Sequence, residues 1–221
     1  MGKQATRTSV LEIATRYGNE LAGIHKVMVK YRPYICPFTT MLNKIPKGSS
    51  IFDIGCGSGF FLYACRMLCN ATKTVGVDAN PGAIRLAESV ARKSFPSESW
   101  AFSTGKTCKV WPDRTFDVVS IIDVLHHVEA QAQADFVKEA ARRVRPGGLI
   151  LIKDMLPRPA FCGMMNRLHD LILARQWISY VDLRGVVSLL RDQGYTLEYE
   201  GDATMVWYSH RLIVMSKTGA E

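Results

Sequence analysis

The sequence predicts an α/β protein in which a mostly parallel sheet carries helices on both faces. Between residues 50 and 153, segments with a strand pattern alternate with segments with a helical pattern, and short turn sequences separate them. The runs 116–122 and 149–153 are continuously apolar, which is typical of strands buried on both faces. Strand–helix alternation and doubly buried strands together favour a parallel sheet.

Periodicity and turn residues predict the individual elements. Strands are expected at residues 50–54, 73–78, 99–103, 116–122 and 149–153, with helices between them at 59–69, 80–93 and 131–145. Pro146-Gly147-Gly148 is expected to end the last of these helices. The C-terminal part is expected to hold helices at 160–175 and 182–193 and strands at 195–200 and 204–215. These two strands flank the turn Gly201-Asp202, and strands joined by so short a link are antiparallel, so a hairpin is predicted.

The first fifty residues form a distinct basic segment. Apolar side chains spaced by three and four residues predict one helix over residues 8–32, which Pro33 ends, and a short helix follows at 36–44. Residues 1–50 contain eight Lys and Arg residues and only two acids, so this segment carries +6 of the net charge of +8. An anionic partner near this segment is therefore one possibility that the charge raises.

The length predicts one main domain with additions. We expect a helical cap over residues 1–48, followed by a ligand-binding domain over residues 49–221 with a helical insertion at about 157–182. No run reaches the roughly 18 apolar residues that span a bilayer, and the N-terminus lacks a signal layout, so a cytoplasmic location is expected. The six cysteines show neither a C-x-x-C pair nor zinc spacing with histidine, so we expect reduced thiols and no metal.

A glycine-rich turn after the first strand is the candidate site. Asp53-Ile54-Gly55-Cys56-Gly57-Ser58-Gly59 places glycine at every second position, which lets a ligand lie against bare backbone. The turn lacks the Gly-Lys-Ser/Thr of a phosphate loop and the G-x-G-x-x-G of a dinucleotide site. Asp53 favours a cationic ligand over a pyrophosphate. Asp78 ends the next strand, where a carboxylate can accept the hydroxyls of a ribose.

Four segments resemble the successive motifs of class I S-adenosylmethionine (SAM)-dependent methyltransferases: residues 51–60, 75–80, 116–127 and 144–152. The resemblance implies SAM as cofactor, S-adenosylhomocysteine (SAH) as product, and a Rossmann-like sheet of seven strands whose last strand is antiparallel and inserted beside its neighbour. It places the three glycines against the methionine part, Asp53 near its amino group and Asp78 on the ribose. With the residues beside these and the positions discussed below, the full set of expected cofactor contacts is Asp53, Gly55, Cys56, Gly57, Ser58, Gly59, Asp78, Ala79, Thr104 and Asp123.

The adenine end departs from the family pattern. Many relatives carry an acid after the third strand, which accepts a hydrogen bond from the adenine amino group. The matching position falls near Lys106, and a lysine side chain cannot accept a hydrogen bond. A backbone carbonyl, Thr104 or Thr107 is expected to take this place.

A candidate base follows the fourth strand. Asp123-Val124-Leu125-His126-His127 follows the strand at 116–122, at the mouth of the expected cofactor cleft. Methyl transfer requires alignment of the nucleophile and exclusion of water, and a hydroxyl acceptor also requires a base. His126 and His127 are the candidates because histidine titrates near neutral pH. The alternative is that one of them packs against or caps the following helix.

The expected acceptor is a small or medium apolar molecule methylated on oxygen, either free, lipid-linked or tethered to an acidic carrier protein. The insertion and the N-terminal helix would form its pocket, with ordinary core packing as the alternative. The N-terminal helix also fits peripheral contact with a membrane surface. Two other functions stay open. RNA methylation is disfavoured because no Asn/Asp-Pro-Pro-Tyr/Phe motif is present. A non-catalytic partner subunit is disfavoured by the intact glycine turn.

Overall fold

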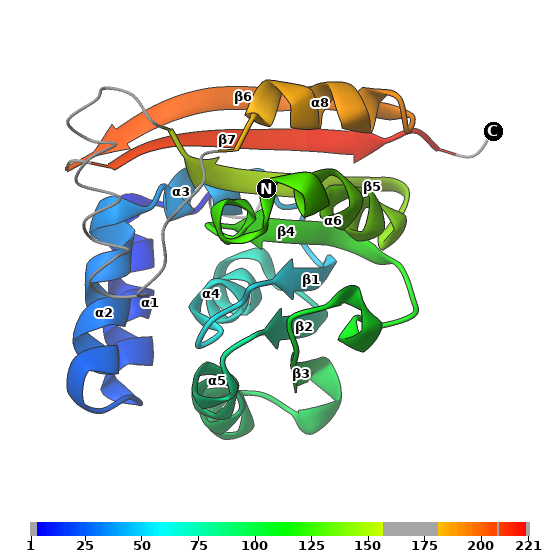
Figure 1. The fold of residues 1–221 in the computed structure, drawn as a ribbon. Helices are drawn as coiled ribbons and strands as arrows, with labels where there is room; N and C mark the ends of the chain where they lie inside the picture. The colour runs from blue at the N-terminus through cyan, green and yellow to red at the C-terminus, as the bar shows by residue number, and fades with distance from the viewer. Residues whose placement is uncertain (1–3, 157–180, 207, 220–221) are drawn as a thin grey trace.

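The computed structural model describes residues 4–156, 181–206 and 208–219. Its centre is a seven-stranded sheet in the order β3-β2-β1-β4-β5-β7-β6 (Figure 1). The strands are β1 (Ser50–Ile54), β2 (Lys73–Asp78), β3 (Trp100–Thr104), β4 (Phe116–Ile122), β5 (Val144–Met155), β6 (Tyr195–Met205) and β7 (Tyr208–Lys217). β1 to β5 are parallel, and β7 runs antiparallel between β5 and β6. The predicted fold class is therefore confirmed.

Helices cover both faces of this sheet. One hydrophobic core contains residues of α1 (Arg7–Asn19), α3 (Phe38–Leu42), α4 (Phe60–Cys69) and α5 (Pro81–Ser94), and the other contains residues of α6 (Ala130–Arg142) and α8 (Leu183–Arg191). Ile51 belongs to the first core and its neighbour Phe52 to the second. This division follows from the alternation of side chains along a strand, which sends successive residues to opposite faces.

The N-terminal segment forms two helices where the spacing predicts one. α1 ends at Asn19, and α2 (Gly23–Ile35) packs beside it after a turn in which Gly23 has a φ of +56° (Figure 1). Pro33 lies within α2 and does not end it. A proline this close to the end of a helix removes few hydrogen bonds. The spacing of three and four residues continues across the turn, so periodicity alone did not reveal the break.

The C-terminal hairpin turns later than the sequence predicts. β6 continues to Met205 and β7 begins at Tyr208, whereas Gly201 and Asp202, the predicted turn, lie within the strand ladder. Asp202 accepts hydrogen bonds from the guanidinium of Arg211 on β7 at 2.7 and 2.8 Å. This cross-strand pair gives the polar residues a place in the ladder, so they do not form the turn.

The predicted break after the helix at 131–145 is also misplaced. α6 ends at Arg142, and Pro146-Gly147-Gly148 lies within β5, where the pairing with β4 shifts register and Gly147 has a φ of +71°. These residues therefore form an irregularity in a strand. The predicted helix at 160–175 and nearly all of the predicted insertion fall on residues 157–180, which lie outside the described residues. The domain boundary at residue 48 stays a prediction.

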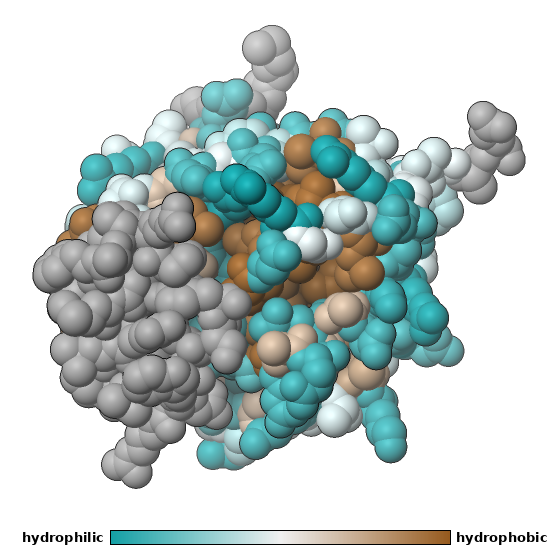
Figure 2. All heavy atoms as spheres, turned by 45° about the horizontal axis from the view of Figure 1, so that its top comes forward, coloured by the Kyte–Doolittle hydropathy of each residue, from teal (hydrophilic) through white to brown (hydrophobic). Residues whose placement is uncertain are grey.

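Figure 2 turns the top of the molecule, where α8 and β6 lie, toward the viewer. Hydrophobic side chains gather near the middle of this face, and hydrophilic side chains border them. Within residues 4–156, 181–206 and 208–219, no helix has the length and apolar character needed to cross a membrane.

Candidate functional site

The glycine-rich turn lies at the carboxyl end of β1, where the chain passes into α4 (Figure 1). Gly55, Gly57 and Gly59 have φ angles of +76°, +55° and +85°, a region that favours glycine. At Gly55 there is no space for a side chain either, because a Cβ would lie 2.2 Å from Cγ2 of Val124. A Cβ at Gly57 would meet no atom within 4 Å. The backbone at Gly57 therefore borders open space.

A cavity of about 320 Å³ lies between this turn and α2. Six of the predicted cofactor contacts line it: Asp53, Gly55, Cys56, Gly57, Ser58 and Asp123. The α2 side of the cavity is lined by His25, Met28, Val29 and Arg32, and aromatic surface comes from Phe38, Phe60 and Phe61. The fold thus places the glycine turn, Asp53 of β1 and Asp123 after β4 opposite α2, a helix of the basic N-terminal segment.

Asp53 is a buried carboxylate on the wall of this cavity. Its residue is 2% exposed, and the hydroxyl of Ser120 on β4 donates a hydrogen bond to it at 2.6 Å. Burial raises the pKa of Asp53 to about 7, and the bond from Ser120 offsets only part of this rise. A cation beside a buried carboxylate favours its ionised form. Asp53 is therefore suited to a positively charged ligand.

Four predicted contacts lie beside the cavity without lining it: Gly59, Asp78, Ala79 and Thr104. The carboxylate of Asp78 accepts hydrogen bonds from the amides of Gly57 and Asn80, both at 2.8 Å. Asp78 therefore holds the glycine turn in place, a contact that the sequence did not predict. Thr104 ends β3 and pairs with Asp78 in the ladder, so both lie at the same edge of the sheet.

Asp123 connects the cavity to a buried ion pair. Its φ of +57° is uncommon for a residue other than glycine. One carboxylate oxygen accepts a hydrogen bond from the ammonium of Lys153, and Nη2 of Arg32 lies 3.5 Å from the other. Burial pushes the pKa of Asp123 upward, but Lys153 and Arg32 outweigh this effect and hold the pKa well below its usual range. Asp123 therefore stays ionised between its two cations.

Sequence reasoning missed Arg32 and Lys153. The sequence held a signal for Lys153, because a lysine ends an otherwise apolar predicted strand. In the fold this residue is 1% exposed. Arg32 carried no such signal, because its role depends on how α2 packs. Tyr17 is also 1% exposed, and its hydroxyl donates a hydrogen bond to the carbonyl of Ser58. This bond ties α1 to the glycine turn.

Comparison with known proteins shows to which family the chain belongs. Residues 28–200 match the sequence model of a family described as a methyltransferase domain. The chain belongs to the class I SAM-dependent methyltransferases. The match covers well over half of the chain and includes the turn, both acids and most of α2.

Two curated relatives match this methyltransferase over part of their length. A 27-O-demethylrifamycin SV methyltransferase of Amycolatopsis mediterranei is 30% identical over 53% of this chain and 42% of its own length. A tRNA U34 carboxymethyltransferase of Hydrogenovibrio crunogenus is 31% identical over 50% of this chain and 33% of its own length. The matched region thus spans less than half of either relative.

Solved structures show the same fold. An O-methyltransferase family protein from Burkholderia thailandensis has a TM-score of 0.71 at 17% identity, covering 98% of this chain and 64% of that one. Magnesium protoporphyrin IX methyltransferase from Synechocystis, with bound SAH, has a TM-score of 0.63 at 15% identity, covering 99% of this chain and 90% of that one.

The chemistry of the cavity fits SAM, the cofactor of this family. SAM presents a sulfonium, an ammonium, a carboxylate and a ribose. Asp53 and Asp123 are acids that could hold the cationic groups, Arg32 is a cation that could hold the carboxylate, and the bare backbone at Gly57 leaves room for the ligand. Each charged group of the ligand therefore has a side chain of opposite sign available on the cavity wall.

The two candidate bases of this methyltransferase follow Asp123 by three and four residues. His126 is 3% exposed, and its Nδ1 lies 2.6 Å from a carboxylate oxygen of Asp154 on β5. His127 is exposed, with its ring centroid 4.0 Å from that of His126. Neither residue lines the cavity. Asp154 orients the ring of His126, which suits packing and proton transfer equally, so a catalytic role for either histidine stays a prediction.

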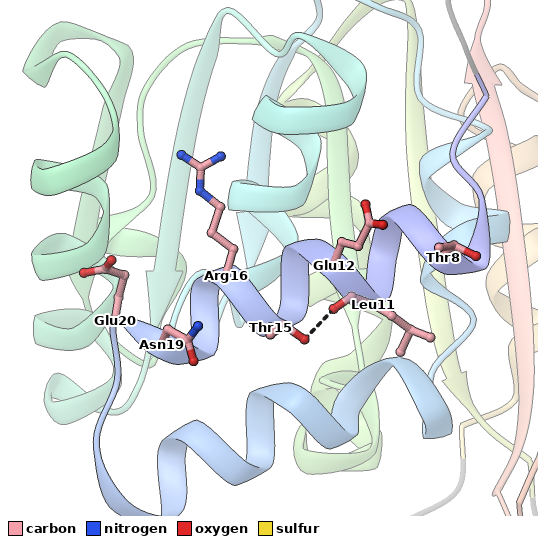
Figure 3. A pocket seen from close by; sticks show the side chains of 7 residues that line it. All are labelled: Thr8, Leu11, Glu12, Thr15, Arg16, Asn19 and Glu20. Atoms are coloured by element: carbon pink, nitrogen blue, oxygen red, sulfur yellow. Dashed lines mark hydrogen bonds between the residues drawn. The ribbon is translucent and has the colours of Figure 1, made fainter.

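A second hollow lacks comparable chemistry. It has a volume of about 580 Å³ and lies on the outer side of α1 (Figure 3). Its lining residues are Thr8, Leu11, Glu12, Thr15, Arg16, Asn19 and Glu20. All come from α1 and the residue after it, so the lining comes from a single helix. In the part of the chain that the structure describes, no group of three His, Cys, Asp or Glu residues could hold a metal ion.

Proposed function

We propose that this methyltransferase transfers the methyl group of SAM to an oxygen atom of a small or medium apolar acceptor. The observation that carries the proposal is the cavity in which the glycine turn and two acids face α2. When bound, SAM supplies a methyl group that its sulfonium has already activated. The chain itself has to bind both molecules, orient the acceptor and exclude water.

Charge assigns the roles of the residues in this proposal. Asp53 takes the ammonium, because the cation offsets the burial that raises its pKa. Arg32 takes the carboxylate, since no other Lys or Arg among the described residues lines the cavity. Asp78 takes the ribose hydroxyls with the lone pairs that its two backbone hydrogen bonds leave free. His126 or His127 accepts the proton that the acceptor hydroxyl loses.

The character of the acceptor follows from the α2 side of the cavity. Met28 and Val29 of α2 and the neighbouring Phe38 of α3 provide apolar wall there, and adaptable methionine and aromatic walls suit a bulky apolar molecule. Two relatives have names that specify an O-position, the 27-O-demethylrifamycin SV methyltransferase and an erythromycin 3''-O-methyltransferase of Saccharopolyspora erythraea, which supports oxygen as the acceptor atom. An acceptor carried by a lipid or by an acidic carrier protein also agrees with the basic N-terminal segment.

Calorimetry with two ligands tests the binding roles. We expect SAH to bind the native chain, and Arg32→Ala to weaken SAH by about 10- to 100-fold, the equivalent of one charged hydrogen bond. 5'-Methylthioadenosine lacks the carboxylate, so its affinity should not change. Lys26→Ala is the matched control, because Lys26 lies on the same helix and does not line the cavity.

Each part of the proposal can fail separately. If SAH does not bind the native chain, the assigned function is wrong. If Arg32→Ala weakens both ligands equally, Arg32 supports the fold of the pocket and does not hold the carboxylate. Labelled SAM offered with a panel of apolar hydroxyl compounds, and separately with tRNA, tests the acceptor. Label in tRNA alone would reject a small apolar acceptor.

A further inference from the structure

α2 carries an exposed apolar surface that no described element covers. Five large hydrophobic side chains on this helix are exposed: Ile24 by 65%, Val27 by 61%, Met28 by 43%, Tyr31 by 39% and Tyr34 by 43%. Only two other large hydrophobic side chains among the described residues are equally open to solvent. We call these five residues the α2 stripe. Their spacing of three and four residues places them along one side of the helix.

The opposite side of α2 is buried, so the stripe is not a frayed or loosely packed segment. Val29 and Pro33, on the side opposite the stripe, are buried, and α2 packs against α1. In Figure 1 α2 stands at the outer edge of the molecule, on the side to which β1 and β2 point. The helix is therefore held by one face and presents the other outward.

Positive charge accompanies the stripe. α2 contains Lys26, Lys30 and Arg32 and no acidic residue. Two of the five stripe residues are tyrosines, whose rings are amphipathic and prefer the boundary between lipid and water. Nζ of Lys30 donates a hydrogen bond to Asn19 on α1 at 3.1 Å, so this lysine lies on the flank of α2 next to α1 and not in the stripe. Long lysine side chains on the flank of a membrane-bound helix can extend their ammonium groups toward anionic headgroups while the apolar side chains enter the acyl region. This combination is typical of a helix that lies on an anionic bilayer.

The stripe is continuous with the proposed SAM cavity. Met28 belongs to both, and Arg32 on the same helix also lines the cavity. A molecule held in a lipid surface against the stripe would therefore lie next to the opening of the site. We propose that α2 docks this methyltransferase on an anionic lipid surface, from which an amphiphilic acceptor enters the cavity. The acceptor part of this proposal rests on the proposed function, whereas the docking part does not.

Charge also argues against the two other occupants of such a surface. A second copy docked through α2 about a two-fold axis would bring the cations of both helices together, which is unfavourable. An acidic carrier protein would have the charge opposite to that of the lysines, but the five large apolar side chains of the α2 stripe offer few polar groups for it to bind. An anionic bilayer matches both the apolar and the charged parts.

Vesicle sedimentation with the full chain tests docking. We expect the native protein to sediment with vesicles of phosphatidylcholine and phosphatidylglycerol, and much less with phosphatidylcholine alone. The double variant Ile24→Ser/Val27→Ser should lower the vesicle partition coefficient by at least about ten-fold, since two large side chains no longer enter the lipid. Lys26→Glu should lower it by about five-fold or more, since each cation near an anionic surface contributes on that scale.

Matched controls keep the result interpretable. Val110→Ser removes another exposed apolar side chain, 38% exposed and outside α2, and should leave partition unchanged. SAH calorimetry and thermal unfolding on every variant report folding and the cofactor site, because Ile24 and Val27 do not line the cavity. If the native protein binds SAH normally but does not bind vesicles, membrane docking is wrong and the proposed methyltransferase function is unaffected.

Two further outcomes would also overturn docking. One is equal sedimentation of the native protein and the double variant. The other is a dimer of the native protein, detected by light scattering, that does not form in the double variant, while neither the native protein nor the variant binds vesicles.

Vesicles made from a total lipid extract test the acceptor with labelled SAM. We expect label in the organic phase, and about ten-fold less with the double variant. Label confined to the aqueous phase would reject a lipid-borne acceptor.

Discussion

Asp53 gives the sharpest prediction, because the same carboxylate should destabilise the empty protein and attract its ligand. Its pKa in the folded protein is about 7, raised from 3.8 by burial. The folded state therefore prefers the protonated form, and this contribution to stability is present below about pH 4 and is lost as the pH rises toward 7. Asp53→Asn carries no titrating group, so it should escape this loss.

The magnitude follows from the shift. One pKa unit corresponds to about 1.36 kcal/mol, so a rise from 3.8 to about 7 costs the ionised folded state about 4 kcal/mol at pH 8. The amide oxygen of asparagine can still accept the bond from Ser120, but its NH2 group would be buried without an assured partner, at a cost of about 2 kcal/mol. We therefore expect Asp53→Asn to be about 2 kcal/mol more stable than the native protein at pH 8, and about 2 kcal/mol less stable at pH 4.

Urea unfolding at several pH values between 4 and 8 measures this difference. The control is Asp117→Asn. Burial pushes the pKa of Asp117 up, but hydrogen bonds from Ser50 and Arg145 outweigh it, so the pKa is lowered. That carboxylate stabilises the fold above its unfolded pKa, and this contribution is lost only as the pH falls toward the lowered folded pKa. The effect of Asp117→Asn should therefore be nearly constant between about pH 5 and 8, unlike that of Asp53→Asn. SAH calorimetry should show weaker binding in Asp53→Asn. A pH-independent stability difference would refute the reasoning about Asp53.

Three further predictions concern the same site. Asp78→Ala should weaken SAH binding by about 1–3 kcal/mol for its lost charged hydrogen bonds; unchanged calorimetry would reject the ribose assignment. Gly55→Ala should lower the free energy of unfolding by about 3 kcal/mol, because its Cβ would lie 2.2 Å from a methyl group, whereas Gly57→Ala should cost only about 1 kcal/mol; equal losses in urea unfolding would contradict this. If His126 or His127 is the base, one of the two His→Ala variants should methylate at least about 100-fold more slowly while its SAH affinity stays unchanged; native-like rates in both variants would exclude both histidines as the base.

Elements with a strong local pattern were predicted closely. The apolar run of β4 and the strand of β2 have the bounds that the sequence predicts, and the glycine turn lies where expected between β1 and α4. Elements whose ends depend on distant partners were not. Gly201 and Asp202 have the composition of a turn, yet the cross-strand pair with Arg211 holds them in β6. The break before Gly23 left no trace in the apolar spacing.

By itself the sequence determined the fold class, the glycine turn and the acids that end β1 and β2, because each depends on neighbours within a few residues. Only the tertiary structure decided what faces these acids across the cavity. Arg32 reaches Asp123 because α1 and α2 fold back as a pair, and Lys153 reaches it because β5 lies beside β4. These partners lie 91 and 30 residues from Asp123 in the chain. Their charges meet because helix and strand packing place them there, and no local pattern encodes such packing.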